Sequence, residues 1–201
     1  AANDHVEESR SPHAKQWHYS RDRKWKWLDD TSSDEITGHL FSLALFHDLV
    51  ADAAQQRRAQ QLISRIVTNI IDHNFQLIDY DGKPTRWGIW MPDSLNLSPN
   101  WMYERGLNSL QILSFLTTAY HYTHEKKFAD TKRDLIEKHH YADNAVTAKI
   151  YGPFETSHSD DILNFFPYYG LLRYEEDPAW RALFVKSLER SWLAVRADCM
   201  P

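Results

Sequence analysis

The stretch "LNSLQILSFLTTAYHY", Leu107 to Tyr122, decides the fold of this chain. Its apolar residues fall on nearly every face of a helix, which is typical of a helix packed on all sides. The segment that follows, "KFADTKRDLIEKHH" from Lys127 to His140, is mostly charged and predicts a helix with one solvent-facing side. A buried helix followed by a half-exposed one predicts a helical hairpin with an inner and an outer member.

The same contrast occurs on both sides of this hairpin. Before it, "EITGHLFSLALFHDLVADA", from Glu35, is apolar on almost every face, and "QQRRAQQLISRIVTNIIDHN", from Gln55, carries one apolar stripe. After it, residues 161–174 are almost wholly apolar, with Pro167 expected to kink the helix, and residues 179–195 carry large apolar side chains on one side. Three inner–outer pairs predict an all-α fold of stacked helical hairpins that forms an (α/α)-toroid or a partial toroid.

The segment "FQLIDYDGKPTRWGIW", Phe75 to Trp90, is the one place where we expect strands. Apolar and polar residues alternate in it, and the dipeptide Asp81-Gly82 suits the turn of a β-hairpin. We therefore expect a small β-hairpin inserted between the first and second helical hairpins.

The remaining sequence suggests how the chain is divided. Residues 1–24 are polar and have no period, so we interpret them as an N-terminal arm or lead-in loop before a helical domain at 25–201. Because the chain begins at Ala1 rather than at Met, we expect a processed product or a fragment of a longer chain. The single cysteine, Cys199, excludes an internal disulfide.

Composition narrows the classes of partner. A chain that is 42% hydrophobic and 25% charged is typical of a soluble globular protein. No apolar run approaches the roughly 18 residues of a membrane span. The net charge of -5 argues against nucleic acid, whose binding depends on clustered Lys and Arg. We expect no membrane or nucleic-acid partner and no nucleotide or redox cofactor.

If the hairpins alternate regularly, the inner helices all point the same way. Their N-termini and the long loops then meet at one end of the fold, which we call the mouth. The mouth segments are "DDTSSDE", "TRWGIW", "NWMYERGLNS" and "ETSHSDD". Six of the eight Trp fall in these segments or in the lead-in region beside them: Trp17, Trp25, Trp27, Trp87, Trp90 and Trp101.

A mouth with this composition suits a carbohydrate. Indole rings cover the apolar faces of sugar rings, and carboxylates, hydroxyls and amides bind sugar hydroxyls. Helix N-termini favour an anion, and Arg86 can bind a carboxylate through two hydrogen bonds, so a uronic acid is a plausible guest.

A family resemblance agrees with this interpretation. The segments "WKWLDDTSSDEITGHLFSLALFHDLV", "LIDYDGKPTRWGIW", "GLNSLQILSFL" and "HSDDILNFFPYYGLLRYE" resemble the helical-toroid domain of a bacterial group. That group is similar to the six-hairpin (α/α) glycosidases and polysaccharide lyases, including unsaturated glucuronyl hydrolases. The resemblance covers roughly Trp25 to Trp192 and implies a carbohydrate-active toroid. Three hairpins make only half of a six-hairpin ring, which implies a fragment or a reduced form with an open cleft.

Glycoside hydrolysis needs two carboxyl groups on opposite sides of the scissile bond. Neighbouring acids on a helix point about 100° apart, so we expect one group from each acidic cluster and choose Asp34 and Asp160. In this hypothesis Asp160 donates a proton to the leaving oxygen and Asp34 is the base or nucleophile, while His158 can carry a proton near neutral pH. The alternative is that these groups only cap helices.

The remaining candidates are expected to bind substrate, and each has a structural alternative. Trp87 and Trp90 can stack on sugars or only brace the hairpin, and Asn108 suits a helix cap as well as a sugar hydroxyl. In the first mouth segment, Ser32 and Glu35 fit a capping box. The candidate binding residues are Asp30, His39, Arg86, Trp87, Trp90, Asn108 and Asp161.

Neither candidate metal site has a convincing spacing, so we expect no metal. The pair His47-Asp48 resembles that of metal phosphohydrolases, but it lies at the far end of its helix with no second His spaced to complete a site. A tight motif such as H-E-x-x-H is also missing among the mouth donors Asp34, His39, His158 and Asp160.

Two alternatives to hydrolysis stay open. A polysaccharide lyase would use His158 or Tyr103 as the base, with Arg86 neutralising the uronate. A non-catalytic sugar-binding or scaffold half-toroid is also compatible with the sequence, because fold resemblance does not confer activity. We expect an extracellular or periplasmic location, and a second copy or the rest of a longer chain to cover the edges of the half-ring.

Overall fold

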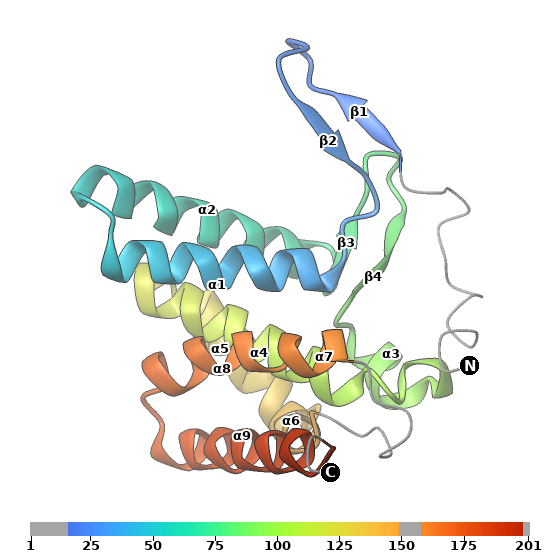
Figure 1. Ribbon diagram of the computed structural model, residues 1–201, viewed down its shortest axis with the longest axis vertical. Coiled ribbons are helices and arrows are strands. Elements are labelled where there is room, and N and C mark those ends of the chain that lie inside the picture. The colour runs from blue at the N-terminus through green and yellow to red at the C-terminus, as the bar shows by residue number, and fades with distance from the viewer. Residues whose placement is uncertain (1–15, 149–157, 199–201) are drawn as a thin grey trace.

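The computed structural model describes residues 16–148 and 158–198, except the side chains at 158, 159, 161 and 195–198. This part of the chain is mostly helical, with two small antiparallel sheets of two strands each (Figure 1). The strands are β1 (Trp17–Tyr19), β2 (Lys26–Leu28), β3 (Gln76–Ile78) and β4 (Pro84–Ile89). The helices are α1 (Ser33–Leu49), α2 (Ala53–Asp72), α3 (Pro92–Leu97), α4 (Arg105–Thr123), α5 (Lys126–Glu137), α6 (Tyr141–Val146), α7 (His158–Leu163), α8 (Phe165–Tyr174) and α9 (Pro178–Asp198), with a 3-10 turn, η2, at Pro99–Trp101.

The helical content and the three hairpins are confirmed. The pairs are α1–α2, α4–α5 and α8–α9, and the members of each pair contact one another. The capping box at the start of α1 is also confirmed, since Ser32 Oγ accepts from the backbone N–H of Glu35 while the Glu35 carboxylate accepts from that of Ser32. Asp52 and Gln55 form the same motif at the start of α2.

Helix α4 is the centre of the core, as its sequence predicts. It is buried continuously from Gly106 to Ala119, and Leu110, Ile112 and Leu116 have no exposed surface. Helices α2, α5, α6 and α8 all pack against it, so every face of α4 meets another element. These neighbours explain why a helix with apolar residues on nearly every face is stable here.

Helix α1 does not fit the expectation of burial on all sides. Ile36, Leu40 and Ala44 are buried along one face, whereas Phe46 is 37% and Leu49 is 69% exposed. The reason is its position: α1 lies at the edge of the helical body, beside α2 and α8, and no helix of the described part of the chain covers its outer side (Figure 1).

The helix expected over residues 161–174 is interrupted, as its proline predicts, but the interruption lies three residues before Pro167. The break falls at Asn164, between α7 and α8, and Pro167 lies in the first turn of α8. A proline is tolerated in the first turn because the backbone N–H groups there have no partner within the helix.

Helices α1, α4 and α8 run in the same direction, as the hairpin pattern predicts (Figure 1). Their C-terminal ends meet, since the Tyr122 hydroxyl lies 2.7 Å from that of Tyr174 and 2.9 Å from the Asp48 carboxylate. However, α8 contacts α1 as well as α4. In an open ring α4 would lie between α1 and α8 and keep them apart. Because α1 and α8 are in contact, the toroid arrangement is not confirmed.

The predicted β-hairpin is present as β3–β4. Its turn spans residues 79–83, and Gly82 has a φ of 81°, a conformation that other residues rarely adopt. A second hairpin, β1–β2, was not expected. It pairs Trp17 with Leu28 and crosses the boundary between residues 24 and 25 that separates the expected arm from the helical domain.

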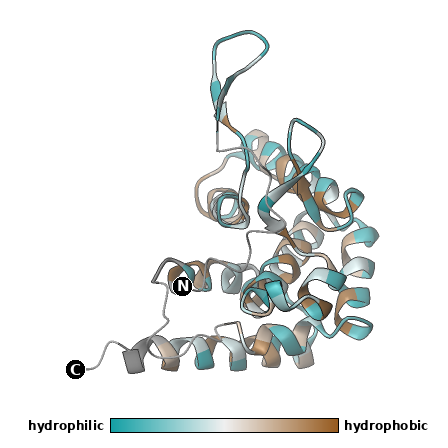
Figure 2. Ribbon diagram, turned by 90° about the vertical axis from the view of Figure 1, so that its right-hand side faces the viewer, coloured by the Kyte–Doolittle hydropathy of each residue, from teal (hydrophilic) through white to brown (hydrophobic). Residues whose placement is uncertain are grey.

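The distribution of hydropathy follows this architecture. Hydrophobic residues concentrate where the helices face one another, whereas the hairpins that extend from the body are largely hydrophilic (Figure 2). Among the described helices, none is both long and apolar enough for a bilayer span.

Candidate functional site

The expected mouth is built from the N-terminal ends of α1 and α4 with strand β4. Helix α1 contacts β4, and Asn108, in the first turn of α4, donates from its side chain to the carbonyl of Ile89 at the end of β4 (2.9 Å). The chain therefore brings together two of the three expected inner-helix N-termini and the strand that carries Arg86 and Trp87.

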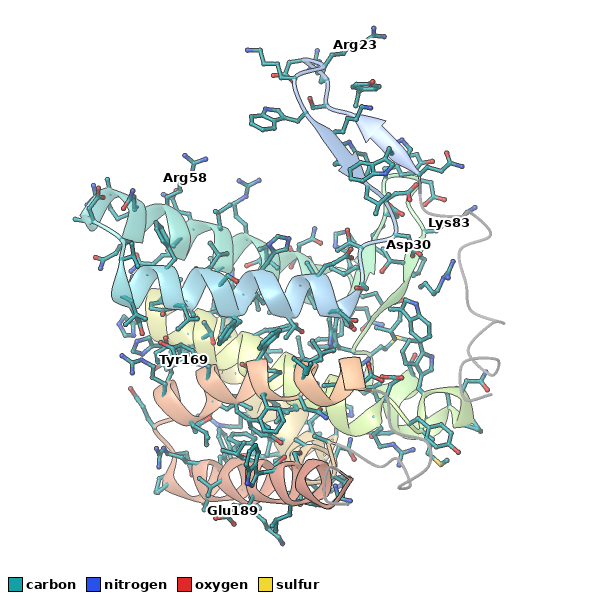
Figure 3. All side chains as sticks on the ribbon, viewed as in Figure 1. Arg23, Asp30, Arg58, Lys83, Tyr169 and Glu189 are labelled. Carbon is teal, nitrogen blue, oxygen red and sulfur yellow. The ribbon has the colours of Figure 1, made fainter. Side chains whose placement is uncertain are left out.

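Asp30 joins the two β-hairpins to the start of α1 (Figure 3). It is 2% exposed, and its carboxylate accepts from the backbone N–H of Arg86 (2.7 Å) and forms an ion pair with the Arg86 side chain (3.5 Å). Its own backbone N–H donates to Asp79 (2.8 Å). The prediction that Asp30 is available to a ligand meets a side chain that is buried and engaged by these contacts.

Trp90 and Asn108 also belong to the core rather than to a binding surface. Trp90 has no exposed surface, and its indole N–H donates to Gln111 (2.9 Å) while its carbonyl accepts from the Tyr141 hydroxyl (2.6 Å). Asn108 is 1% exposed. Both were predicted to contact substrate, but they have almost no exposed surface, because β4 leads directly into the packed interior around α4.

Four of the expected residues remain accessible at this end. Asp34 is exposed in the first turn of α1, where it accepts a hydrogen bond from Ser33 (3.1 Å), and His39 is exposed one turn later. Trp87 is half-buried and meets Trp101 edge to face at 6.4 Å. The Arg86 side chain is 28% exposed.

The third expected inner-helix start is α7. Asp160 is half-buried there, whereas the side chains of His158 and Asp161 lie outside the described part of the chain. Stacking of Phe41 on Phe166, 4.8 Å between ring centroids, sets the beginning of α8 against the middle of α1. Helix α7 comes directly before α8, and α8 runs parallel to α1. Asp160, in α7, therefore lies toward the N-terminal half of α1.

A second polar cluster lies at the opposite end of the same helices. The Asp48 carboxylate, whose side chain is 12% exposed, accepts hydrogen bonds from all three inner helices. The donors are His47 of α1 (3.1 Å), Tyr122 of α4 (2.9 Å), and Tyr169 (3.3 Å), Arg173 (2.8 Å) and Tyr174 (2.8 Å) of α8.

These contacts determine how Asp48 titrates. Burial disfavours the ionised carboxylate, but hydrogen bonds from Tyr174, His47, Tyr122 and Arg173 outweigh burial and hold the pKa of Asp48 below its usual range. Burial likewise raises the pKa of Tyr122 and of Tyr174, and the neighbouring Asp48 adds to both shifts. The cluster is therefore an ionised carboxylate surrounded by neutral phenols.

A cavity of about 460 Å³ opens beside this cluster, and His121 lines it together with Asp48 and Gln56. Burial lowers the pKa of His121, although the charge of Asp48 acts in the opposite direction. The imidazole stacks on Tyr174 at 4.2 Å and is neutral near pH 7. A neutral imidazole beside a carboxylate resembles an acid–base site, but Asp48 accepts from five donors and primarily connects three helices.

The described residues contain no group of three or more His, Cys, Asp or Glu that could hold a metal ion. The pair His47-Asp48 is therefore explained by hydrogen bonding. Sequence reasoning recognised this pair but missed its partners, because Tyr122 and Arg173 are 74 and 125 residues away from Asp48.

At the mouth end, sequence reasoning missed one feature, the β1–β2 hairpin. Trp17 is 67%, Tyr19 is 61% and Trp25 is 73% exposed. On the other side, His18 stacks on Trp27 at 4.6 Å. Its residues form the stretch "WHYSRDRKWKWL", most of which lies in the segment interpreted as an arm.

No family model, curated protein or solved structure matches this chain. The functional argument therefore depends on the residues and contacts described above.

Proposed function

We propose that this chain binds and cleaves an acidic, uronate-containing oligo- or polysaccharide at the mouth, by acid/base glycoside hydrolysis. The observation that carries the proposal is the contact of β4, with its half-buried Arg86 and Trp87, against the N-terminal ends of α1 and α4. This arrangement offers a guanidinium for a uronate carboxylate beside an indole for the ring face, with the exposed carboxylate of Asp34 nearby.

In this mechanism Asp160 protonates the leaving oxygen and Asp34 acts as base or nucleophile. Asp160 is assigned the role of acid because it is half-buried at the start of α7, beside the N-terminal half of α1. Asp34 suits the second role because it is exposed and follows directly on the N-terminus of α1, where the helix dipole favours a negative charge. His158, in α7, is the further candidate for carrying a proton.

The test is a screen of the purified chain on uronate polysaccharides, following new reducing ends and the ultraviolet absorbance of an unsaturated uronate. Reducing ends alone are expected, because hydrolysis creates no double bond. Asp34→Asn and Asp160→Asn should each lower turnover by at least about a hundredfold, the usual contribution of general acid–base catalysis.

Glu137→Gln, which removes an exposed acid from α5, is the matched control and should keep full turnover. Absorbance rising with reducing ends would identify a lyase, with Tyr103 as the candidate base. If no product forms but sugar raises the melting temperature, the chain only binds. Full turnover in a correctly folded Asp160→Asn variant would contradict the catalytic assignment.

The toroid is a separate part of this proposal. We propose that the three hairpins form an arc of a ring. A second copy, or the rest of a longer chain, would extend this arc. The parallel direction of α1, α4 and α8 supports an arc, whereas the contact between α1 and α8 favours a closed bundle of three inner helices. Small-angle X-ray scattering of the chain, with and without its neighbouring sequence, distinguishes the two shapes.

A further inference from the structure

We propose that the β1–β2 hairpin, Trp17 to Leu28, is a binding arm for an extended anionic polysaccharide. The inference rests on the proposed function and deepens it. A mouth alone would accept a short uronate oligosaccharide, whereas a mouth continued by such an arm suits a polymer.

The arm presents aromatic rings on both of its faces. In the strand register, Tyr19 lies opposite Lys26 on one face, and His18 lies opposite Trp27 on the other. Trp17 and Trp25 are more than two thirds exposed, although large aromatic side chains normally gain stability by burial. Exposed apolar surface that is concentrated on one element indicates an interaction site.

The arm is also basic in an acidic protein. It contains four cations, Arg21, Arg23, Lys24 and Lys26, and one carboxylate, whereas the whole chain has a net charge of -5. The carboxylate of Asp22 is engaged within the turn, where it accepts from the Ser20 hydroxyl (2.6 Å) and from the backbone N–H of Lys24 (3.1 Å).

These cations have room for a ligand. Within the described residues, none of the four lies within ion-pair distance of a carboxylate. Arg23 points away from the body at the tip of the hairpin (Figure 3). Lys26 lies over the ring of Tyr19 at 4.9 Å, which combines a charge for a uronate carboxylate with a ring for a sugar face.

The arm is joined to the mouth by specific contacts. His18 contacts Tyr80, at the tip of β3–β4, with 4.4 Å between ring centroids, and its Nε2 lies 2.8 Å from the carboxylate of buried Asp29. The same carboxylate accepts from the backbone N–H of Gln16 (2.6 Å). The arm is thereby held beside the hairpin that carries Arg86, so one extended ligand can contact both.

Charge and shape favour a polysaccharide over a membrane. A hairpin that inserts into a bilayer carries apolar residues at its tip, but the tip here consists of residues 21–24, all charged. An acidic carbohydrate chain can instead use both rings and cations on an exposed surface, and residues 17–27 carry both.

The experiment compares binding of the full chain to polygalacturonate, alginate and hyaluronate with its binding to the corresponding trisaccharides, by calorimetry at low and high salt. The arm variants are Arg21→Gln/Arg23→Gln/Lys24→Gln and Trp17→Ser/Trp25→Ser. Their matched controls are Arg57→Gln/Arg58→Gln/Arg65→Gln, on the exposed face of α2, and Trp192→Ser, which is 57% exposed on α9.

We expect each arm variant to weaken binding of the polymer by about tenfold or more and to leave trisaccharide binding unchanged. Polymer binding should also weaken with salt. The control variants should bind both ligands as the native chain does, and unchanged melting temperatures verify that all variants fold.

The inference is overturned if the arm variants bind the polymer as tightly as the native chain. It is equally overturned if phosphatidylserine vesicles or oligothymidylate bind the arm more tightly than every polyuronate tested. If the native chain binds the polymer no more tightly than the trisaccharide, the arm is removed but the proposed function stays in place. No binding of either length would remove both.

Discussion

Asp48 shows how one side chain can determine the position of three helices. Its two carboxylate oxygens accept hydrogen bonds from α1, α4 and α8, and the contacting residues Asp48, Tyr122 and Tyr174 are each more than 50 residues apart in the sequence. Hydrogen bonds to a charged acceptor are stronger than those between neutral groups, and they are stronger still where water is largely excluded. The cluster therefore stabilises the parallel arrangement of the inner helices at the end opposite the mouth.

Asp48→Ala is expected to lower the free energy of unfolding by about 3 kcal/mol, because the hydroxyls of Tyr122 and Tyr174 then lose their acceptor in a largely buried site. Urea denaturation measures the change. Asp48→Asn, which keeps one acceptor oxygen, should cost less, and Tyr169→Phe, which removes only the longest of the bonds (3.3 Å), should cost about 1 kcal/mol or less. A loss below about 1 kcal/mol for Asp48→Ala would show that the cluster is not a stabilising centre.

At the level of elements, α4 organises the fold because it can be approached closely from several sides. Its contact with α6 depends on Gly106, where a Cβ atom would overlap the carbonyl oxygen of Thr147 at the end of α6. On the side of α5 and α8, buried Lys132 forms an ion pair with buried Glu175 at 2.7 Å. Close backbone packing thus joins α6 to α4, and one buried ion pair joins α5 to the end of α8.

Gly106→Ala should destabilise the protein by about 2–3 kcal/mol, because the added methyl group meets backbone atoms that can yield only if α6 moves. The measurement is the midpoint and slope of chemical denaturation. Gly38→Ala is the matched control, since Gly38 lies inside α1 with nothing within 4 Å of an added Cβ. That substitution should stabilise by up to about 1 kcal/mol through helix propensity. Equal effects at the two positions would refute the proposed close packing of α4 on α6.

For the whole molecule, buried tyrosines determine the response to high pH. Burial raises the pKa of Tyr141 and of Tyr168, as it does for the tyrosines of the Asp48 cluster. Such groups stay protonated in the folded state but ionise in the unfolded chain above about pH 10, the ordinary tyrosine value. Their contribution to stability is therefore fully present below pH 10 and is lost as the pH rises further.

We expect the free energy of unfolding to fall steadily above about pH 10, and tyrosinate absorbance near 295 nm to rise in a cooperative step together with the loss of helical circular dichroism. Tyr168→Phe should make the fall less steep, because one group fewer ionises only on unfolding. Titration of all the tyrosines without loss of helix would contradict the burial of these rings.

Much of the local structure followed from the sequence. The periodicity of apolar residues predicted the three helical hairpins, because residues three or four apart lie on the same face of a helix and are buried or exposed together. The Ser32–Glu35 capping box and the turn at Gly82 were also predicted, since both depend on residues close in the chain. The β1–β2 hairpin was missed because its strands are only three residues long and its turn lacks an Asn-Gly or Asp-Gly signal.

The candidate site was less predictable. Trp87 and Trp90 are three residues apart and look alike in the sequence, yet one is half-buried at the surface and the other has no exposed surface. Trp192 belongs to the large apolar side chains predicted on one side of residues 179–195, yet it is 57% exposed. Such outcomes depend on which neighbouring element covers a side chain, and that information is not local.

The sequence by itself determined the secondary structure of the helical hairpins, their order and the parallel direction of the inner helices, because these follow from local periodicity and short connections. The tertiary structure alone decided which aromatic rings are exposed, that α8 contacts α1, and that Asp48 gathers donors from three helices. The physical reason is that burial and hydrogen bonding between distant segments depend on how the helices pack, and many packings are compatible with one pattern of periodicity.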